Sequence, residues 1–415
     1  MKSVLVLGGA GGVGRYAVRV LRDDPVVDRI VVADRDLELC TAFCREQGPK
    51  VVPLALDVSD PSALVAAMHD TDLVMSCVGP FFRFGVAVLS AAIEAGRSYV
   101  DICDDPEPTL AMLELDARAR ERGISALVGM GITPGVSNLL AVLAARELDE
   151  TLELVTGWDL AAALPETIGP EPSAATLHGV EQLSGHIRVF REGEFVDEPP
   201  IDKRVLDVPG LGRRQAYTIG HPEPVTLPRT FPGLRACRNV FTAPLDTVVA
   251  LRALRFFVDR GILGARTAAR WAERFEGPGG KTPRLADLLA DARRRGTMSL
   301  PPIFALAHGV RAGQPASVLV TLASAPAGGL GGTTGVPLAV AAGMMLRGEI
   351  ERCGVFAPEA GVDPIRFLDR LAPLCDPPRA SCAGLAVTVR SWESTRLLEA
   401  LAVQLEASSG LDRKP

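Results

Sequence analysis

The chain has 415 residues, 47% of them hydrophobic, and carries a formal net charge of −6. One hydrophobic core rarely serves so long a chain, so we expect two domains. The acidic balance and the scattered basic residues exclude the electrostatic footprint of a nucleic-acid-binding protein. Eight cysteines without a C-x-x-C pair argue against a disulfide scaffold and a metal site, and favour a cytoplasmic location.

The N-terminus joins an apolar strand to a glycine-rich turn. Residues 4–14 have the sequence VLVLGGAGGVG, which ends in G-x-G-x-x-G and precedes a helical pattern. The three glycines permit a tight turn, a close approach of backbone to a pyrophosphate, and close packing of helix on strand. The phosphates then meet the positive end of the helix. We therefore expect a dinucleotide here, held by Gly9, Gly11, Gly12, Val13 and Gly14.

Asp34 ends the next apolar strand, 20 residues beyond Gly14. A carboxylate at this spacing accepts hydrogen bonds from the ribose hydroxyls and repels a 2′-phosphate, so NAD is favoured over NADP. Arg35 leaves NADP open, because a guanidinium beside the ribose could hold that phosphate. The plainer interpretation of Asp34 is a polar strand end. The glycines in register favour the ribose role.

Strands and helices alternate from there to about residue 128. We expect strands at 51–57, 73–78, 98–102 and 125–128, and helices at 61–69, 86–94 and 108–121. Parallel strands need crossover helices, so the alternation predicts a Rossmann-type, doubly wound parallel sheet of the α/β class. Asp57 and Val58 end the third strand, where such folds touch the adenine.

Three segments follow the carboxyl ends of later strands, where ligands of such sheets bind. They are an expected loop at 79–85, residues 101–105, and a turn at 129–135 rich in glycine and proline. We expect Gly79, Pro80 and Phe81 to contact the cofactor. Beyond the turn, Ser137 and Asn138 can cap a helix at 139–146.

The middle of the chain has a different pattern. A strand at 152–158 and a hairpin at 187–196 around Gly193 predict a mixed sheet with long loops, where we expect the substrate chemistry. Histidines here are candidates for proton transfer: His178, His186 and His221. For each one the plainer interpretation is a hydrogen-bonded structural histidine, and His69 at the end of a helix is expected to be inert.

The sequence resembles the saccharopine dehydrogenase family of NAD(P)-dependent oxidoreductases, which includes saccharopine reductases and lysine 6-dehydrogenases. The resemblance is carried by residues 79–81, 99–105, 131–138, 220–232, 331–337 and 354–359. It implies a nucleotide domain at 1–132, an inserted α/β substrate-binding and dimerisation domain at 133–330, a helical return at 331–375, and commonly a homodimer. A strand and helix at 376–415 lie outside the resemblance.

The resemblance also implies the chemistry, which is hydride transfer at the carbon–nitrogen centre of an amine or amino-acid-like substrate. His221 or His178 would move the proton at neutral pH, with Asp104 and Asp105 holding an ammonium or orienting a histidine. Arg229, ahead of Arg83, would clamp a carboxylate. Glu223 and Thr133 are further candidate substrate contacts.

Thr133 departs from the family pattern. Saccharopine reductases carry an aspartate at this position, whereas a threonine does not titrate near neutrality. This difference weakens saccharopine itself as the substrate, and the motif is closer to that of lysine 6-dehydrogenases.

Two other functions stay open. A reductase of C=C or C=O bonds in lipid or polyketide metabolism would have an apolar pocket without a carboxylate anchor. A non-catalytic NAD(P)-binding redox sensor would lack convergent polar groups. We expect no membrane partner, because the apolar stretch at 336–346 is only 11 residues long. The chain opens on its first strand, so no signal peptide is expected.

Overall fold

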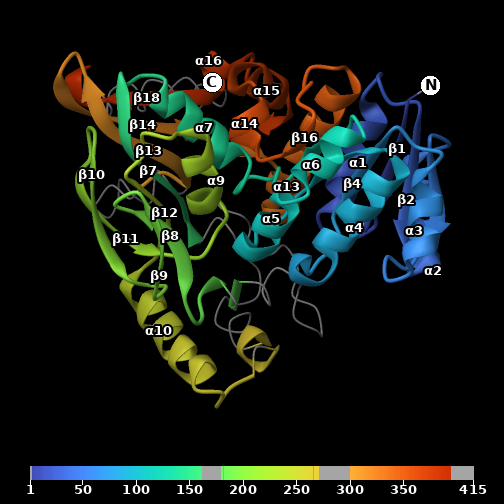
Figure 1. The fold of residues 1–415 in the computed structure, drawn as a ribbon, viewed down its shortest axis with the longest axis horizontal. Helices are drawn as coiled ribbons and strands as arrows, with labels where there is room; N and C mark the ends of the chain where they lie inside the picture. Colours follow the sequence, from blue (N-terminus) through green and yellow to red (C-terminus); the bar gives the residue numbers. More distant parts are fainter. Residues whose placement is uncertain (1, 161–178, 181, 265, 271–299, 394–415) are drawn as a thin grey trace, which may run out of the picture. The chain divides into compact units, whose positions relative to one another are not determined.

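The computed structural model describes residues 2–160, 179–180, 182–264, 266–270 and 300–393, and His178 lies outside them. The chain divides into two compact units (Figure 1). Unit 1 comprises Met1–Leu139 and Pro326–Leu371, and unit 2 comprises Leu140–Ala325 and Ala372–Pro415. The sequence-based boundaries were placed after residues 132, 330 and 375, and the units divide after Leu139, Ala325 and Leu371.

Unit 1 is built on a seven-stranded parallel sheet in the order β16-β6-β5-β4-β1-β2-β3. The strands are β1 (Ser3–Leu7), β2 (Arg29–Asp34), β3 (Val51–Ala55), β4 (Leu73–Ser76), β5 (Ser98–Asp101), β6 (Ser125–Leu127) and β16 (Gly354–Phe356). Their apolar runs are buried because helices cover both faces of a doubly wound sheet. The predicted α/β class is confirmed.

Ten helices of the described residues begin in unit 1. They are α1 (Gly14–Asp23), α2 (Leu37–Gln47), α3 (Pro61–Met68), α4 (Phe81–Ala95), α5 (Pro106–Leu113), α6 (Asp116–Glu121), α7 (Val136–Ala145), α13 (Gly329–Leu346), α14 (Pro358–Gly361) and α15 (Pro364–Leu371). Aspartates start two of them: Asp36 and Asp60 each accept hydrogen bonds from two backbone N–H groups of the following turn.

Two expectations for unit 1 were wrong in detail. The segment expected as a loop at 79–85 is helical from Phe81 onward, because Gly85 is a packing position rather than a turn. A Cβ on Gly85 would lie 3.3 Å from the Phe81 ring of the same helix and 3.5 Å from the Met112 sulfur of α5, so Gly85 is packed inside the fold. The helix expected at 108–121 is two helices, α5 and α6.

Helix α13 returns to unit 1 from the C-terminal part of the chain. It packs along α1, and a Cβ on Gly335 would lie 3.1 Å from the Ala17 nitrogen. With 18 residues, α13 is longer than the apolar stretch expected at 336–346, and its length and composition alone would allow it to cross a membrane. Most of the helix, 72% of the 18-residue window, is buried within the protein.

Unit 2 contains a nine-stranded mixed sheet with β10-β11-β12-β7-β13-β14-β18 in sequence across it and the β8–β9 hairpin paired to β12. The strands are β7 (Glu150–Asp159), β8 (Ile187–Arg191), β9 (Glu194–Glu198), β10 (Lys203–Val208), β11 (Gly212–Thr218), β12 (Ala236–Thr242), β13 (Ile303–Arg311), β14 (Gln314–Leu322) and β18 (Ala386–Arg390). Among the strands of the described residues, β12 and β7 alone pair in parallel. The mixed sheet was expected, and so were β7, the β8–β9 hairpin and β18.

The remaining elements are short apart from one helix. They are α9 (Glu223–Thr230), α10 (Leu245–Asp259), β15 (Ala325–Pro326), η2 (Ala372–Leu374), β17 (Cys375–Asp376), α16 (Cys382–Leu385) and η3 (Ser391–Glu393). Strand β18 pairs with β14, so the described part of the C-terminal tail completes the edge of the mixed sheet.

Candidate functional site

The turn between β1 and α1 is too tight for any side chain at its last glycine. A Cβ on Gly14 would lie 2.6 Å from the Gly9 Cα and would overlap the Gly8 carbonyl oxygen. A Cβ on Gly9 would lie 2.9 Å from the side chains of Val6 and Val32. Helix α1 begins at Gly14 without a side-chain cap, and the nitrogens of Arg15, Tyr16 and Ala17 donate to the Gly11 and Val13 carbonyls. The start of the helix, at Gly12 to Gly14, is where a phosphate would bind.

Gly12 is different, because it faces open space. A Cβ there would meet nothing within 4 Å. On its other side the turn is lined by the start of α13: a Cβ on Gly331 would lie 2.8 Å from the Gly12 carbonyl oxygen. The segment 331–337 therefore packs against the glycine turn that follows β1. In the sequence, only the glycines of this segment pointed to such a close contact.

Acidic side chains stand at the ends of β2 and β3. Asp34 is partly exposed and its Oδ1 accepts a hydrogen bond of 3.2 Å from the Asp36 nitrogen. Asp57 is exposed, and the hydrogen bond of 2.8 Å from the Ser59 nitrogen lowers the pKa of its carboxyl, with a smaller contribution from Arg35. Val58 beside it packs on the core of unit 1. The arrangement matches a site for a nucleoside at this edge of the sheet.

The end of β4 leads directly into α4. Gly79 and Pro80 form the connection, and the Phe81 side chain is buried in the core. Arg83 in the first turn is exposed, with its guanidinium 4.8 Å from the centre of the Phe84 ring. The expected cofactor contacts at 79–81 thus lie at the carboxyl edge of the sheet, and Arg83 extends from that edge into solvent.

Asp101 at the end of β5 is fully buried. Its Oδ1 accepts hydrogen bonds from the nitrogens of Cys103 at 3.0 Å and Gly129 at 2.8 Å, and its Oδ2 accepts one of 2.8 Å from the Tyr99 hydroxyl. Burial raises the pKa of Asp101 to about 6, against the lowering effect of these donors. The carboxylate ties β5 to the turn at 129–135. Sequence reasoning quoted Asp101 within a motif but gave it no role.

Asn138 holds the same turn from its other end. Its Oδ1 accepts a hydrogen bond of 2.9 Å from the Gly135 nitrogen, and its Nδ2 donates one of 2.8 Å to Glu359 in α14. Helix α7 begins at Val136, three residues before the expected start, so Asn138 lies within its first turn and reaches back. The turn is therefore anchored at both ends.

The other candidates of unit 1 lie on these two loops. Thr133 is half-buried within the turn. Asp104 is half-buried between β5 and α5, and Asp105 is buried at the start of α5. The structure thus brings Asp104, Asp105 and Thr133 to the carboxyl edge of the parallel sheet, as predicted for ligand-binding loops.

In unit 2, His221 and Glu223 form a buried pair. The Nδ1 of His221 lies 2.7 Å from Oε2 of Glu223, and the two side chains are 3% and 0% exposed. The Trp158 ring of β7 packs on the imidazole, with the ring centres 4.8 Å apart. A carboxylate that accepts the Nδ1 proton leaves the Nε2 lone pair as a base, so the pair can act in general acid–base chemistry.

Glu223 was expected to contact the substrate, whereas the structure places it against His221. Arg229 is exposed in the last turn of α9, six residues after Glu223 opens that helix. Because a helix rises about 1.5 Å per residue, the two side chains start about 9 Å apart along the axis. The structure therefore pairs His221 with Glu223 and leaves Arg229 apart from them. His186 is exposed just before β8.

Comparison with known proteins gives a family match for the nucleotide domain. Residues 4–127 match the family described as "Saccharopine dehydrogenase NADP binding domain". The chain is 24% identical over 399 residues to carboxyaminopropylagmatine dehydrogenase from Synechocystis, a match that covers 89% of this chain and 95% of that protein.

A second relative matches over a shorter span. Saccharopine dehydrogenase [NADP(+), L-glutamate-forming] from Pyricularia oryzae is 33% identical over 147 residues, covering 35% of this chain and 31% of that protein. The match therefore spans about a third of the relative.

A solved structure shares the fold. The apo saccharopine dehydrogenase (L-Glu forming) from Saccharomyces cerevisiae superposes with a TM-score of 0.62 at 17% identity, covering 94% of this chain and 100% of that one. The likeness confirms the predicted combination of a Rossmann-like parallel sheet with a second, mixed-sheet domain.

Proposed function

We propose that the protein is an NAD(P)-dependent oxidoreductase acting at a carbon–nitrogen centre, on the basis of the match of residues 4–127 to the family "Saccharopine dehydrogenase NADP binding domain". The dehydrogenase names of the relatives support this proposal. The substrate is an amine or imine with an amino-acid-like carboxylate, processed in amino-acid metabolism. Asp34 favours NAD over NADP as the cofactor.

The buried pair of His221 and Glu223 is the observation that carries the proposal. An amine nitrogen must lose its proton before hydride can leave its carbon, because an ammonium has no lone pair to form the C=N bond. Glu223 accepts the Nδ1 proton at 2.7 Å and so directs the Nε2 lone pair toward this task. A bound nicotinamide cofactor in its oxidised form would supply the hydride acceptor. In the reverse direction, the imidazolium returns the proton to nitrogen.

The other candidates take supporting roles in this proposal. Arg229, or else Arg83, binds the substrate carboxylate with its planar fork. Asp104 and Asp105 hold an ammonium group, and Thr133 contacts the substrate from the turn at 129–135. We further propose that the protein is cytoplasmic, from its eight free cysteines, and that it is a homodimer, as the family resemblance implies.

The proposal is tested by following reduction of NAD and NADP with a panel of diamines, basic amino acids and N-carboxyalkyl amines. We expect turnover of at least one amine, and His221→Gln should lower kcat by about 10²-fold, the usual scale for a lost general base. His221→Gln should still fold and bind NADH. His69→Gln, at an exposed histidine, is the matched control and should keep the full rate.

Other results would assign a different function. An unchanged rate in folded His221→Gln would pass the proton-transfer role to His178, Asp104 or Asp105. Turnover restricted to ketones or enones would contradict amine chemistry and favour a C=O or C=C reductase. NADH binding without turnover of any substrate would favour a redox sensor.

A further inference from the structure

Helix α10 of unit 2 has two apolar faces. Its inward face carries Val248, which is fully buried, and Leu251, Leu254 and Val258, which pack on apolar clusters of unit 2. Its outward face carries large side chains that remain exposed: Val249 is 59% exposed, Phe256 48% and Phe257 44%. So much apolar surface on one 15-residue helix marks an interaction site.

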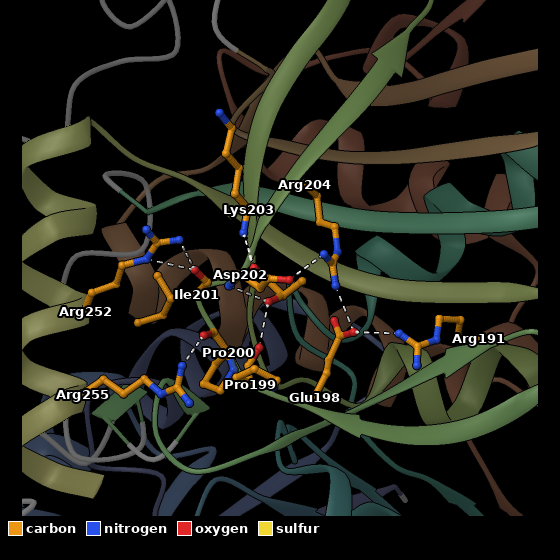
Figure 2. Close-up of polar contacts among 11 residues, drawn as sticks. Arg191, Glu198, Pro199, Pro200, Ile201, Asp202, Lys203, Arg204, Arg252 and Arg255 are labelled. Carbon is orange, nitrogen blue, oxygen red and sulfur yellow. Dashed lines mark hydrogen bonds and ion pairs between the residues drawn. The ribbon is translucent and has the colours of Figure 1, made fainter. Parts of the chain in front are cut away.

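The outward face belongs to a helix that is firmly held. Arg252 donates to the Ile201 carbonyl from Nε at 3.2 Å and from Nη2 at 2.8 Å, and Arg255 donates to the Pro200 carbonyl at 2.7 Å (Figure 2). Ile201 has φ of +62°, which β-branched residues rarely adopt. Two guanidinium groups thus fix α10 to the loop between β9 and β10.

That loop is itself braced. Arg204 bridges it, with Nη1 2.6 Å from Asp202 and Nη2 3.0 Å from Glu198 (Figure 2). The Asp202 nitrogen donates to the Thr218 hydroxyl at 3.0 Å. The exposed apolar face of α10 is therefore presented on a fixed support, as a docking surface requires.

Three residues of the outward face are spaced seven residues apart: Asp246, Ala253 and Arg260. Arg260 lies on this face, since its guanidinium stands 3.6 Å from the centre of the Phe256 ring. A repeat of seven places these residues along one stripe of a helix. The stripe has an acid at one end, a base at the other and a small residue between them.

We propose that this face binds α10 of a second copy of the chain, antiparallel, with the two-fold axis at Ala253. The proposal rests on the homodimer proposed above and names its interface. Around that axis, Asp246 lies opposite Arg260 of the partner subunit, because both are seven residues from Ala253. The large Phe256 lies opposite the small Ala250 of the partner subunit, and Val249 opposite Phe257 of the partner subunit.

The outward face of α10 is complementary to itself when a second helix runs antiparallel to it. We therefore infer that the binding partner is a second copy of the chain. Reversing the helix direction brings opposite charges together at both ends, whereas a parallel pair would oppose Asp246 with Asp246. The small Ala253 allows close approach of the helices at the axis, and large side chains meet small ones on either side. An isologous interface requires this self-matching pattern.

Charge reversal tests the interface by sedimentation over a range of protein concentrations. Asp246→Arg and Arg260→Asp should each weaken the wild-type dimer by at least tenfold, because each places like charges opposite one another. The double variant, Asp246→Arg with Arg260→Asp, should restore the dimer. Arg122→Asp, at an exposed arginine after α6, is the matched control and should leave it unchanged.

Cysteine cross-linking tests the axis directly, in a Cys353→Ser background because Cys353 is exposed. Ala253→Cys should form an intermolecular disulfide under mild oxidation. Ala250→Cys should not, because two copies three residues from the axis are offset by about 9 Å along it, beyond the reach of a disulfide.

Two results would overturn the proposal in distinguishable ways. A monomeric wild type at every concentration would remove both the homodimer and this interface. A dimer that resists both charge reversals and fails to cross-link at Ala253→Cys would keep the homodimer and move its interface elsewhere. Neither result bears on the oxidoreductase activity, which is measured separately.

Discussion

Asn138 and Glu359 are joined by a buried hydrogen bond of 2.8 Å although 221 residues separate them in the sequence. Asn138 also accepts a hydrogen bond from the Gly135 nitrogen, so its amide links the turn at 129–135 to α14. The conformation of a loop at the carboxyl edge of the sheet thus depends on a segment near the other end of the chain.

Glu359→Ala should destabilise the protein by about 1–3 kcal/mol, because it leaves a buried amide N–H without this acceptor. Asn138→Ala should cost a similar amount, and the double variant should cost less than the two together. Urea unfolding followed by circular dichroism measures all three. Glu351→Ala, at an exposed glutamate, is the control. Strict additivity would contradict a direct coupling.

Gly14→Ala and Gly12→Ala should behave differently. A Cβ on Gly14 would overlap backbone, so we expect a loss of about 1–3 kcal/mol in the free energy of unfolding. A Cβ on Gly12 meets nothing within 4 Å, so Gly12→Ala should keep its stability but bind NADH more weakly, because the methyl group occupies the phosphate's approach. Equal stability of the two variants would show that the turn tolerates side chains.

Asp34 should set the choice between NAD and NADP. We expect the wild type to bind NADH at least several-fold more tightly than NADPH, because the carboxylate repels a 2′-phosphate. Asp34→Ala should reduce the ratio of the NADPH to the NADH dissociation constant. Asp70→Ala, at an exposed aspartate that follows α3, should leave this ratio unchanged. Fluorescence titration measures the affinities of all three proteins for NADH and for NADPH. Equal affinities in the wild type, or a preference for NADPH, would refute the assignment.

Asp101 should make stability depend on pH. Burial raises its folded-state pKa to about 6, above the ordinary 3.8, so its contribution to stability is full below pH 4 and is lost as pH rises through 6. The free energy of unfolding of the wild type minus that of Asp101→Asn should fall by about 2 kcal/mol between pH 4 and pH 7.

Asp57→Asn provides a control of opposite sign. A backbone hydrogen bond lowers the pKa of Asp57, so its contribution is present above the ordinary value and is lost as pH falls. The same difference, measured for Asp57→Asn, should therefore rise as pH increases toward the ordinary value of 3.8 and change little above it. A flat difference for Asp101→Asn would mean that the pKa of Asp101 is the same in the folded and the unfolded protein.

Arg229 and Arg83 are rival anchors for the substrate carboxylate. Arg229→Lys should raise KM for the amine substrate with little change in kcat, because an ammonium cannot reproduce the planar fork. Arg83→Lys should leave KM unchanged. Steady-state kinetics on the best substrate of the amine panel decides between them, and the reverse pattern would make Arg83 the anchor.

The nucleotide half of the fold could be predicted because its signals are local. Buried parallel strands such as 73–76 are continuous apolar runs, and Gly14 sits where strand and helix meet. The hairpin was also predictable, because Gly193 lies between two strand-like segments. In the structure Glu192 and Gly193 both have positive φ, at 55° and 85°, as a tight hairpin turn requires.

Other features depend on contacts that no local pattern contains. Gly85 indicated a loop in the sequence, whereas in the structure it lies within α4, next to Met112 of α5. Strands β10 to β14 were missed. In β10, Lys203–Val208 alternates more exposed and more buried residues, a period that could have indicated this strand. Glu223 was read as a substrate contact, and only the turn before α9 brings it onto His221.

The 221 residues between Asn138 and Glu359 also set an order of events on the ribosome. At about 5–20 residues per second, Glu359 follows Asn138 out of the ribosome by roughly 10–45 s. Until then β16 is missing, and β6 stands as an open edge of the nascent sheet. Residues 140–325 of unit 2 are synthesised while that edge is still unpaired. The parallel sheet of unit 1 is therefore completed only after most of unit 2 has been made.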